Sequence, residues 1–332
     1  MQNKVENKII LSIILPVYNE AHFISEVIRS IIKSASDFLD LIEIIIVNNQ
    51  STDNTITIAK NILKKEAIQY SFINNDKNNT SAGFNAGIKE ANGKYIMIMG
   101  GHTLLNKTYI KILLNKLKNE IQYDCIGGKH EIIADNFNQE IIKTILTSGF
   151  GVGNSKFRTS NVGGYTDTVP YGTYRKNVFE KFGLFDESYI RNQDLEYNLR
   201  LNTGGGKVYF EPSLITYYRL TKKYSITNFL KKYFHNGKWI GAKIFKNDSW
   251  SWRHTMPLFF LLSIIFCTSA QFFSKTFSVM LVSIILSHLT IGYYFSLVHV
   301  KKIKLGLVMP VFYFIFHLTY GFGTLYGIVN ND

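Results

Sequence analysis

The sequence predicts an α/β fold, with a mostly parallel sheet and flanking helices, followed by a C-terminal region of three transmembrane helices. Short apolar runs alternate with segments of helical periodicity through residues 9–128, an alternation typical of a parallel sheet with helices on both faces. From residue 255 to 329 the chain is instead almost uninterrupted Leu, Ile, Phe, Val, Met and Tyr. We therefore expect a globular domain at 1–218, an amphipathic cationic interfacial region at 219–254 and a membrane region at 255–330.

The expected elements alternate between strand and helix up to residue 128. Apolar runs of strand length predict strands at 9–17, 41–47, 68–73, 94–99 and 125–128. Helical spacing of apolar residues predicts helices between them at 20–34, 53–65, 81–91 and 106–120. A glycine-rich stretch at 150–168 is typical of a mobile functional loop, although an irregular surface connection also explains it. Farther along we expect helices at 178–182 and 193–202, a strand at 207–211 and a cationic helix at 225–245 lying on a bilayer surface.

Three apolar stretches, at 255–273, 277–298 and 305–329, each have about the 20 residues needed to cross a hydrocarbon core. A soluble helical bundle would need three very long and wholly apolar helices, so it is the weaker reading. Basic residues gather between Arg219 and Arg253 and again at 301–304. The positive-inside rule then predicts a multi-pass cell-membrane protein with its globular domain in the cytoplasm and its C-terminus outside. These cations adjoin the spans without a recognition motif, so nucleic acid is not an expected partner.

The first predicted strand ends in a polar turn fixed by a proline, Pro16-Val17-Tyr18-Asn19-Glu20. Open α/β sheets bind ligands at the carboxyl ends of their strands. The backbone at Val17 and the ring of Tyr18 are suited to hold a flat base, and Glu20 to reach a ribose hydroxyl. An ordinary turn between strand and helix, with Asn19 or Glu20 as a helix cap, explains this motif equally well.

Two other strand ends carry candidate ligand-binding groups. The second strand runs into Asn48-Asn49-Gln50-Ser51-Thr52-Asp53, and the fourth into Gly100-Gly101-His102-Thr103. Glycines at a strand end permit close approach by a ligand, and His102 is suited to ligate a metal or meet a phosphate. A purely structural histidine in a turn is the alternative. Small residues around Asn85 leave room for a ligand, and close helix packing also explains them.

The densest polar cluster is the run 191–200, which begins with Arg191 and contains Asp194 and Glu196. These two acids are two positions apart near a helix start, so they point to different faces and one at most faces a cleft. A carboxylate at a helix N-terminus is stabilised as the anion, which suits a general base. The alternative is simple capping by Asp194 and an i,i+4 pair between Glu196 and Arg200.

Taken together, these motifs resemble those of the family 2 glycosyltransferases with the GT-A fold, in particular the membrane-associated succinoglycan-biosynthesis branch. The resemblance spans nearly the whole chain. Beyond the strand ends and Arg191-Asn192-Gln193-Asp194, it includes Phe150-Gly151-Val152-Gly153-Asn154, Asp167-Thr168-Val169-Pro170-Tyr171-Gly172 and Gly183-Leu184-Phe185-Asp186-Glu187.

The resemblance implies inverting transfer of a sugar from a nucleotide-diphosphate donor, UDP-linked, to an acceptor hydroxyl, with Asp194 as base and a divalent cation, Mn²⁺ or Mg²⁺, at the diphosphate. His235-Asn236-Gly237-Lys238-Trp239 is similar to the family's Gln-x-x-Arg-Trp motif. Glu196, Arg191, Lys238 and Trp239 are therefore expected at the acceptor or diphosphate, and His102 at the metal. The implied donor site consists of Pro16, Val17, Tyr18, Glu20, Asn48, Ser51, Asp53, Asn85, Gly100 and Gly101.

Two positions depart from the family pattern. Asn48 stands where the family usually has an acid after the second strand, and Gly100 stands where the acidic metal motif begins. An amide at position 48 still forms hydrogen bonds, and His102 alone favours Mn²⁺ over Mg²⁺.

We therefore expect a membrane-anchored glycosyltransferase that extends a lipid-linked or polysaccharide acceptor, alone or with other polysaccharide assembly proteins. The alternative is a non-catalytic homologue that binds a sugar nucleotide or acts as a scaffold in an assembly complex.

Overall fold

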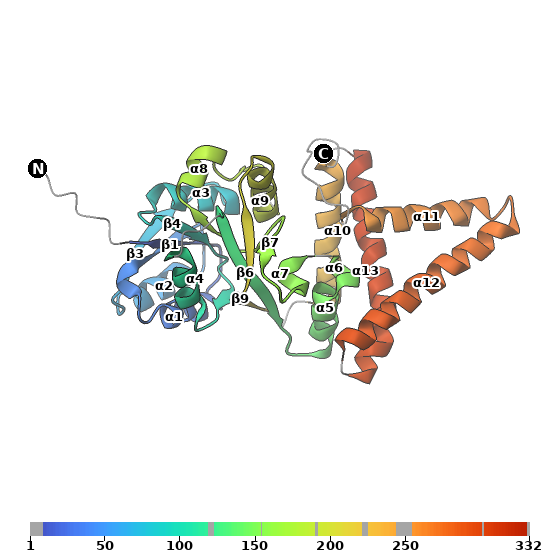
Figure 1. The fold of residues 1–332 in the computed structure, drawn as a ribbon, viewed down its shortest axis with the longest axis horizontal. Helices are drawn as coiled ribbons and strands as arrows, with labels where there is room; N and C mark the ends of the chain where they lie inside the picture. Colours follow the sequence, from blue (N-terminus) through green and yellow to red (C-terminus); the bar gives the residue numbers. More distant parts are fainter. Residues whose placement is uncertain are drawn as a thin grey trace, which may run out of the picture. The chain divides into compact units, whose positions relative to one another are not determined.

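The computed structural model describes residues 9–118, 123–153, 155–189, 192–220, 225–243, 254–300 and 302–330. The chain forms two compact units (Figure 1). The first comprises Met1–Glu131 and Ser160–Arg219, and the second comprises Ile132–Thr159 and Leu220–Asp332. Residues 132–159, which interrupt the first unit in sequence, thus belong with the C-terminal helices.

A single sheet organises the first unit. In the described residues it has nine strands in the order β3-β2-β1-β4-β8-β6-β9-β5, with β7 also paired to β9. The strands are β1 Leu11–Val17, β2 Ile42–Asn48, β3 Gln69–Asn74, β4 Tyr95–Ile98, β5 Thr103–Leu105, β6 Cys125–Ile133, β7 Gly164–Tyr165, β8 Thr173–Arg175 and β9 Val208–Arg219.

The first four strands form the parallel half of this sheet, in which β1 pairs with both β2 and β4, and β2 with β3. Every residue of β1 is buried, as is β2 up to Val47, because helices cover both faces of a parallel sheet. The helices of this unit are α1 Ile24–Ser34, α2 Thr55–Leu63, α3 Thr80–Glu90, α4 Tyr109–Lys118, α8 Asn177–Phe182 and α9 Gln193–Thr203, with a short 3₁₀ turn at Leu39–Leu41.

The expectation of a mostly parallel sheet is wrong for the rest of the sheet, which is mixed. Strand β8 pairs antiparallel with both β4 and β6, and β5 and β7 pair antiparallel with β9. Strands β5 and β8 have three residues each, too few for a periodic pattern. The glycine-rich stretch at 150–168 likewise contains short elements, α6 Gly149–Val152, α7 Lys156–Thr159 and β7.

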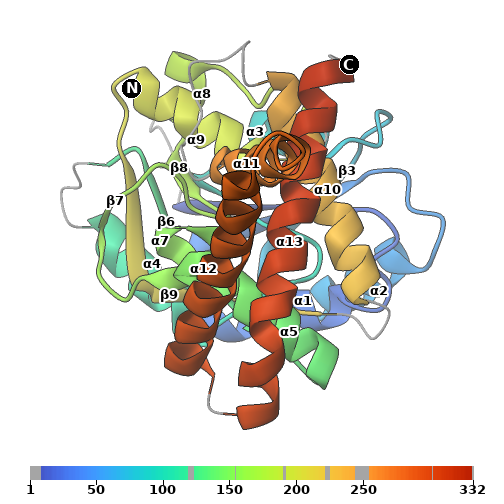
Figure 2. The same cartoon turned by 90° about the vertical axis from the view of Figure 1, so that its right-hand side faces the viewer.

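Helices build the second unit. Besides α6 and α7 they are α5 Phe137–Thr147, α10 Ile226–Lys243, α11 Met256–Ala270, α12 Lys275–His299 and α13 Ile303–Asn330. Helix α13 packs against α10, α11 and α12, and Figure 2 shows it between α12 and α10.

The expected three transmembrane helices are reduced to two candidates. Among the described residues, Lys275–His299 and Ile303–Asn330 are long and apolar enough to cross a membrane. Helix α11 has 15 residues, or about 22 Å of helix at 1.5 Å per residue, which falls short of a hydrocarbon core about 30 Å thick. Its apolar composition alone had suggested a span.

Candidate functional site

The turns after β1 and β2 are bound to each other at the carboxyl edge of the sheet. The side-chain oxygen of Asn19 accepts a hydrogen bond from the backbone N–H of Thr52 at 2.8 Å, and the Asn19 N–H donates to Ser51 Oγ at 3.2 Å. Asn19 has a φ of 53°, a left-handed conformation that asparagine tolerates better than most residues. These two hydrogen bonds fix Asn19, and with it the positions of its neighbours in sequence, Tyr18 and Glu20.

Asp53 strengthens the same junction. Its carboxylate accepts hydrogen bonds from the backbone N–H of Ala21 at 3.1 Å and of Thr55 at 3.0 Å, and from the Thr55 hydroxyl. The pKa of Asp53 is lowered: slight burial opposes ionisation, but the hydrogen bonds from Thr55 and Ala21 outweigh it. Thr55 Oγ1 in turn accepts from the Glu20 N–H at 2.8 Å. In this geometry Asp53 and Ser51 hold the turns in place.

An amide ladder continues the pairing of β2 and β3 beyond the last backbone rung. Its three rungs are Asn48 Nδ2 to Asn74 Oδ1 at 3.3 Å, Asn75 Nδ2 to Asn49 Oδ1 at 2.7 Å and Gln50 Nε2 to the Asp76 carbonyl at 2.7 Å. The amide orientations follow from this network.

Asn48 has both ends of its amide engaged in this ladder, because its oxygen also accepts from the Ser51 N–H at 2.9 Å. The position that lacks the family's acid is therefore part of the connection between two strand ends. Since the side chain is only half-buried, a ligand can still reach it.

The remaining predicted donor residues of the first strand differ in exposure. Val17 is buried, whereas Tyr18 is 49% exposed at the end of β1. Pro16 packs beneath α3, where a Cβ at Gly83 would lie 3.0 Å from Pro16 Cβ and from Asn49 Oδ1. Only glycine lets α3 approach this closely. Tyr18 thus offers an exposed ring on a rigid base, as a stacking surface requires.

The end of β4 meets the β1 turn through a histidine–glutamate contact. His102 Nδ1 lies 3.0 Å from Glu20 Oε1, with the His102 side chain 39% and the Glu20 side chain 20% exposed. A Cβ at Gly101 would lie 3.0 Å from Glu20 Cγ, and one at Gly100 would lie 3.3 Å from the ring of Tyr171. The two glycines therefore make room for Glu20 and Tyr171.

Two side chains that the sequence did not single out, Tyr218 and His130, continue from His102 in a series of ring contacts. The His102 ring meets that of Tyr218 edge-on at 5.2 Å, and the buried His130 lies 5.7 Å from Tyr218 and 5.2 Å from Tyr171. His130 Nδ1 is 3.0 Å from Thr216 Oγ1. The alternation of charged residues with His130 and Ile132 over 129–132 is the sequence signal that would have pointed His130 inward, and burial along β6 follows it, but β6 was expected to end at residue 128.

The donor atoms at this edge do not fit a divalent cation held by the protein alone. No group of three or more His, Cys, Asp or Glu side chains suited to a metal occurs in the described parts of the chain. His102 and Glu20 supply two donors that already contact each other, whereas Mg²⁺ demands six oxygen ligands in near-ideal octahedral geometry.

Asp194 lies in the first turn of α9 and is half-buried. The residue before the helix, Asn192, has a φ of 58°. The buried Asn198 fixes α9 by accepting from the Tyr174 hydroxyl of β8 at 2.9 Å and donating to the Val169 carbonyl at 3.1 Å. Because β8 is the neighbour of β4 in the sheet, Asp194 is carried by a helix anchored to the sheet rather than by a free loop.

Glu196 and Arg200 form the i,i+4 pair that the sequence suggested as the alternative, with Nε to Oε1 at 2.7 Å. The same guanidinium donates to the carbonyls of Phe182 and Leu184. Glu196 therefore stabilises the connection between α8 and α9 in this geometry. Arg191 lies outside the described residues.

Asn85 is also engaged within the protein. Its amide nitrogen donates to the Phe185 carbonyl at 2.9 Å and to Glu187 Oε1 at 3.0 Å, and its oxygen accepts from the Phe185 N–H at 2.9 Å. At 5% exposure, it ties the segment after α8 to α3, which favours a structural role.

Lys238 and Trp239 lie on α10, in the second unit. The Lys238 ammonium group sits 5.0 Å from the ring centroid of Tyr326 on α13, a cation–π contact.

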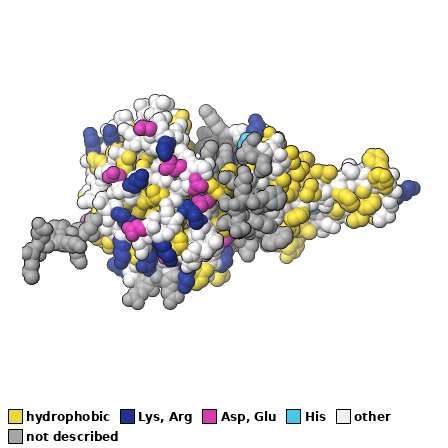
Figure 3. Space-filling model, turned by 90° about the horizontal axis from the view of Figure 1, so that it is seen from above, with side chains coloured by type: hydrophobic (Ala, Val, Ile, Leu, Met, Phe, Trp, Pro, Cys, Tyr) yellow, Lys and Arg dark blue, Asp and Glu magenta, His cyan; other side chains and the backbone are white. Residues whose placement is uncertain are grey.

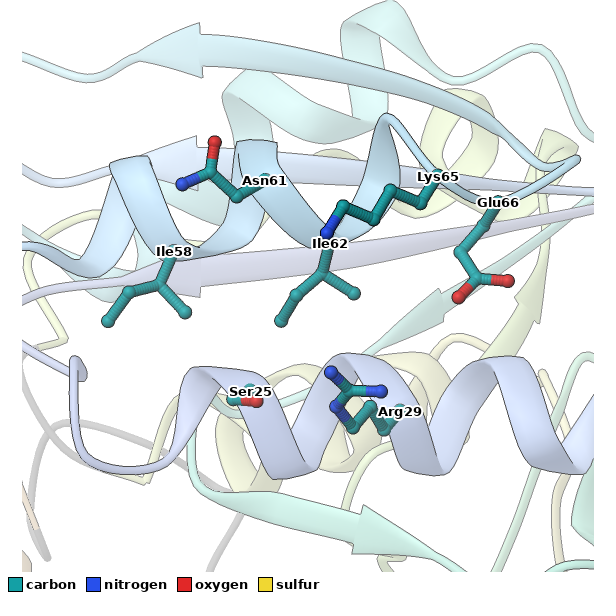
Figure 4. A pocket seen from close by; sticks show the side chains of 7 residues that line it. All are labelled: Ser25, Arg29, Ile58, Asn61, Ile62, Lys65 and Glu66. Atoms are coloured by element: carbon teal, nitrogen blue, oxygen red, sulfur yellow. The ribbon is translucent and has the colours of Figure 1, made fainter.

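A hollow between α1 and α2 is separate from all of these residues. Figure 4 shows its lining side chains, among them Arg29, Asn61 and Lys65. They come from α1, from α2 and from the two residues Lys65 and Glu66 after α2, and they include none of the predicted site residues.

Comparison with protein families gives a match to the model described as glycosyl transferase family 2 over residues 12–183, just over half of the chain. A curated relative from Methanococcus voltae, dolichyl N-acetyl-alpha-D-glucosaminyl phosphate 3-beta-D-2,3-diacetamido-2,3-dideoxy-beta-D-glucuronosyltransferase, is 28% identical over 97% of this chain and 98% of its own length. The succinoglycan biosynthesis protein ExoA of Rhizobium meliloti is 25% identical over 63% of each chain.

Solved structures share the fold. The mannosyltransferase PcManGT of Pyrobaculum calidifontis, in complex with GDP-Man and Mn²⁺, has a TM-score of 0.64 at 13% identity and covers 95% of this chain and 87% of its own. TarS 1–349 of S. aureus in complex with UDP has a TM-score of 0.51 at 17% identity, covering 72% of this chain and 67% of its own. These likenesses support a GT-A-type sheet with flanking helices.

Proposed function

Because the chain belongs to glycosyltransferase family 2, we propose that it is a membrane-anchored inverting enzyme that moves a sugar from a nucleotide-diphosphate donor to a hydroxyl of a lipid-linked saccharide. The observation that carries this proposal is Asp194, a carboxylate in the first turn of a helix anchored to the sheet. The partial positive charge of a helix N-terminus favours the ionised form that a general base needs.

The donor nucleotide is assigned to the cross-linked turns after β1 and β2. The exposed Tyr18 ring stacks on the base, the Val17 backbone and Glu20 face the nucleoside, and Asn48 offers an amide in place of the family's acid. Hydrogen bonds between Asn19, Ser51 and Thr52 hold these groups before the ligand arrives, which lowers the entropy cost of binding. Uracil is the proposed base, as in the UDP bound to TarS, whereas PcManGT holds GDP-Man; the two neighbours together support a nucleoside diphosphate.

In the proposed reaction, Asp194 removes the proton of the acceptor hydroxyl as its oxygen attacks the anomeric carbon. The bond from that carbon to the diphosphate oxygen breaks on the opposite face, so the configuration inverts. A divalent cation, when bound, offsets charge on the leaving diphosphate. Of this chain's own groups, His102 lies at the β4 end beside Glu20, and Lys238 and Trp239 are proposed to meet the acceptor or its diphosphate.

A lipid-linked acceptor is favoured by the relative from Methanococcus voltae, whose name specifies a sugar carried on dolichyl phosphate and which matches 97% of this chain. The two candidate spans and the cationic α10 suit an acceptor that stays at a membrane surface. We assign donor chemistry to residues 1–218, acceptor approach to 219–254 and membrane attachment to 255–330, with the catalytic part in the cytoplasm.

The deciding experiment is transfer from radiolabelled UDP-sugars to lipid-linked saccharides by the detergent-solubilised protein. Asp194→Asn should reduce transfer by roughly 10²–10⁴-fold while nucleotide binding stays unchanged. The matched control is Asp37→Asn, at an exposed acid after α1, which should retain full transfer. Full activity of Asp194→Asn would contradict the assignment of the base.

A second candidate function, a sugar-nucleotide-binding scaffold without catalysis, is favoured by Asn48 and by the incomplete set of metal donors among the residues that the structure describes. The same assay, run with and without Mn²⁺, separates the two. Saturable nucleotide-sugar binding without hydrolysis or transfer would select the scaffold.

A further inference from the structure

Helices α10 and α13 meet through two glycine pairs. Gly237 and Gly241 on α10 face Gly323 and Gly327 on α13, each pair with the spacing Gly-x-x-x-Gly. A Cβ at any of the four glycines would overlap a backbone carbonyl of the opposite helix. Such small-residue pairs let two helical backbones touch along a shared face.

The two helices run in the same direction. Near its start α10 contacts α13 through Phe229 and Phe316, whose rings stack at 5.5 Å. Farther along, Gly237 lies against the Tyr320 carbonyl and Gly241 against that of Thr324. Residue numbers therefore increase in the same direction along both helices, which makes the pair parallel. The contact covers the C-terminal half of α13. Figures 1 and 2 both show the helices side by side.

Helix α10 is unsuited to hydrocarbon. Lys231, Lys232 and His235 are exposed on it, as are Thr227 and Asn228. A lysine at the centre of a bilayer is expensive on every scale, whereas a cationic amphipathic helix lies readily in the interface plane. Since α13 shares the direction of α10 and touches its backbone, its C-terminal half has the same orientation.

The rest of α13 is too short to cross. Residues 303–315, ahead of the contact, amount to about 20 Å of helix, against a hydrocarbon core about 30 Å thick. Helix α13 also begins beside two lysines, Lys302 and Lys304. The hydrophobic window of α13 is 50% buried within the protein, whereas that of α12 is 17% buried. Protein therefore covers about half of the α13 window and little of the α12 window, so most of the α12 surface must be covered by something else.

The hairpin of α11 and α12 carries most of the exposed large apolar side chains of the second unit, and α13 carries most of the others. Phe266, Phe272, Phe273, Val282 and Leu286 are between 55% and 90% exposed, and Figure 3 shows hydrophobic side chains gathered over this part of the second unit. At its base, Phe260 stacks on His288 of α12 at 4.4 Å. Apart from its tip, where Lys275 is exposed, the outer hairpin exposes mainly apolar side chains, which suit lipid acyl chains better than one protein partner.

We propose that α10 and α13 lie together in the interface of one leaflet, and that the α11–α12 hairpin alone inserts among the lipids. A hairpin enters and leaves on one side, so the C-terminus stays on the side of the catalytic unit, and α13 is not a span. This inference rests on the proposed membrane association and changes its topology.

The test is cysteine labelling of the full-length protein in sealed inside-out and right-side-out membrane vesicles, with a membrane-impermeant maleimide. Asn330→Cys reports the exposed end of α13, and Asp37→Cys reports the catalytic unit. Wild type is the background control, because Cys125 and Cys267 are buried. We expect both variants to be labelled in the same vesicle type and protected in the other.

Labelling of the two variants from opposite sides would overturn the inference while leaving membrane association intact. Release of the protein from the vesicles by high salt would instead overturn the insertion itself, and with it the proposed anchoring. Transfer activity, measured on the same preparations, shows separately whether the proposed reaction holds.

Discussion

Three amide side chains extend the pairing of β2 and β3 past the ends of the strands. They belong to Asn48, Asn49 and Gln50, which form hydrogen bonds with Asn74, Asn75 and the Asp76 carbonyl, respectively. The backbone register pairs Asn48 with Asn74, so the ladder begins where the strands end. An amide both donates and accepts, whereas a carboxylate only accepts. This explains why amides suit these positions, and it links the amide-rich composition of the proposed donor edge to the stability of its turns.

Asn49→Ala should lower the free energy of unfolding by about 1–3 kcal/mol, because Asn75 would lose its 2.7 Å partner in a site where both side chains are buried. Urea denaturation measures the change. Asn61→Ala, at an exposed position of α2, is the control and should stay within about 0.5 kcal/mol of wild type. An equal loss of unfolding free energy in both variants would contradict a stabilising role for the amide ladder.

His102 and Glu20 should bind Mn²⁺ only weakly without a bound nucleotide sugar, since two partly exposed side chains form an incomplete coordination shell. Titration of the donor-free protein, followed by the electron paramagnetic resonance of free Mn²⁺, should show no saturable binding below millimolar concentrations. His102→Ala should give the same curve. Tight stoichiometric binding that is lost in His102→Ala would show that the site is complete without the nucleotide.

At the scale of elements, the Glu187 carboxylate joins α3 to the segment after α8. The pKa of Glu187 is lowered because Lys77 and Asn85 donate hydrogen bonds to its carboxylate. A lowered folded-state pKa contributes stability above the unfolded-state value, about 4.3 for glutamate, and that contribution is lost as the pH falls through the folded-state pKa.

Wild type should therefore lose more stability than Glu187→Gln between about pH 7 and pH 3, across the range in which a glutamate titrates. Urea midpoints at the two pH values measure the difference. Glu180→Gln, at an exposed acid on α8, should retain the wild-type dependence. Identical pH dependence in wild type and Glu187→Gln would mean that Glu187 contributes no linked stability.

A second prediction at the scale of elements concerns the contact between α10 and α13. Gly327→Ala should destabilise the second unit by about 1–3 kcal/mol, because its methyl group would overlap the Lys238 carbonyl. Gly306→Ala on the same helix is the matched control, since its nearest neighbour, Ser296 Oγ, would be 3.9 Å away. Thermal unfolding in detergent should separate the two variants, and equal melting temperatures would contradict the tight packing.

Apolar periodicity in the sequence predicted the helices and strands that bury a long row of apolar side chains, and it missed the short elements that do not. Strands β1 to β4 and helices α1 to α4 lie where apolar spacing put them. Strands β5 and β8 hold three residues each, and α5 lies in a stretch that carried no motif. The antiparallel half of the sheet depends on these pieces, so its topology could not be predicted.

The candidate site was predictable to a similar degree. Strand-end turns pointed to Tyr18, Glu20 and His102, and the structure brings Glu20 and His102 into contact. The inward-facing His130 and the Tyr218 ring lie on strands that were expected to be shorter. Engagement of Asn85 and Glu196 within the protein could not be predicted, because their partners are set by tertiary packing.

At the scale of the whole molecule, the residues proposed to bind the sugar nucleotide and the apolar helices belong to different units. Every proposed donor-site residue lies in the first unit, and the apolar helices lie in the second. Separate cores allow one unit to be altered without the other, so attachment to lipid and nucleotide binding can be tested independently.

Val282→Asp should weaken membrane association by about 100-fold, because Val282 is 55% exposed on α12 and an aspartate in the hydrocarbon costs about 2.5–3.5 kcal/mol. Nucleotide binding, measured by calorimetry, should be unchanged. Tyr70→Asp replaces an apolar residue of the first unit that is 38% exposed, and it should leave membrane association at the wild-type level. Flotation on anionic vesicles measures both variants. Equal flotation of Val282→Asp and wild type would show that α12 lies outside the hydrocarbon, and the hairpin could then not be the anchor.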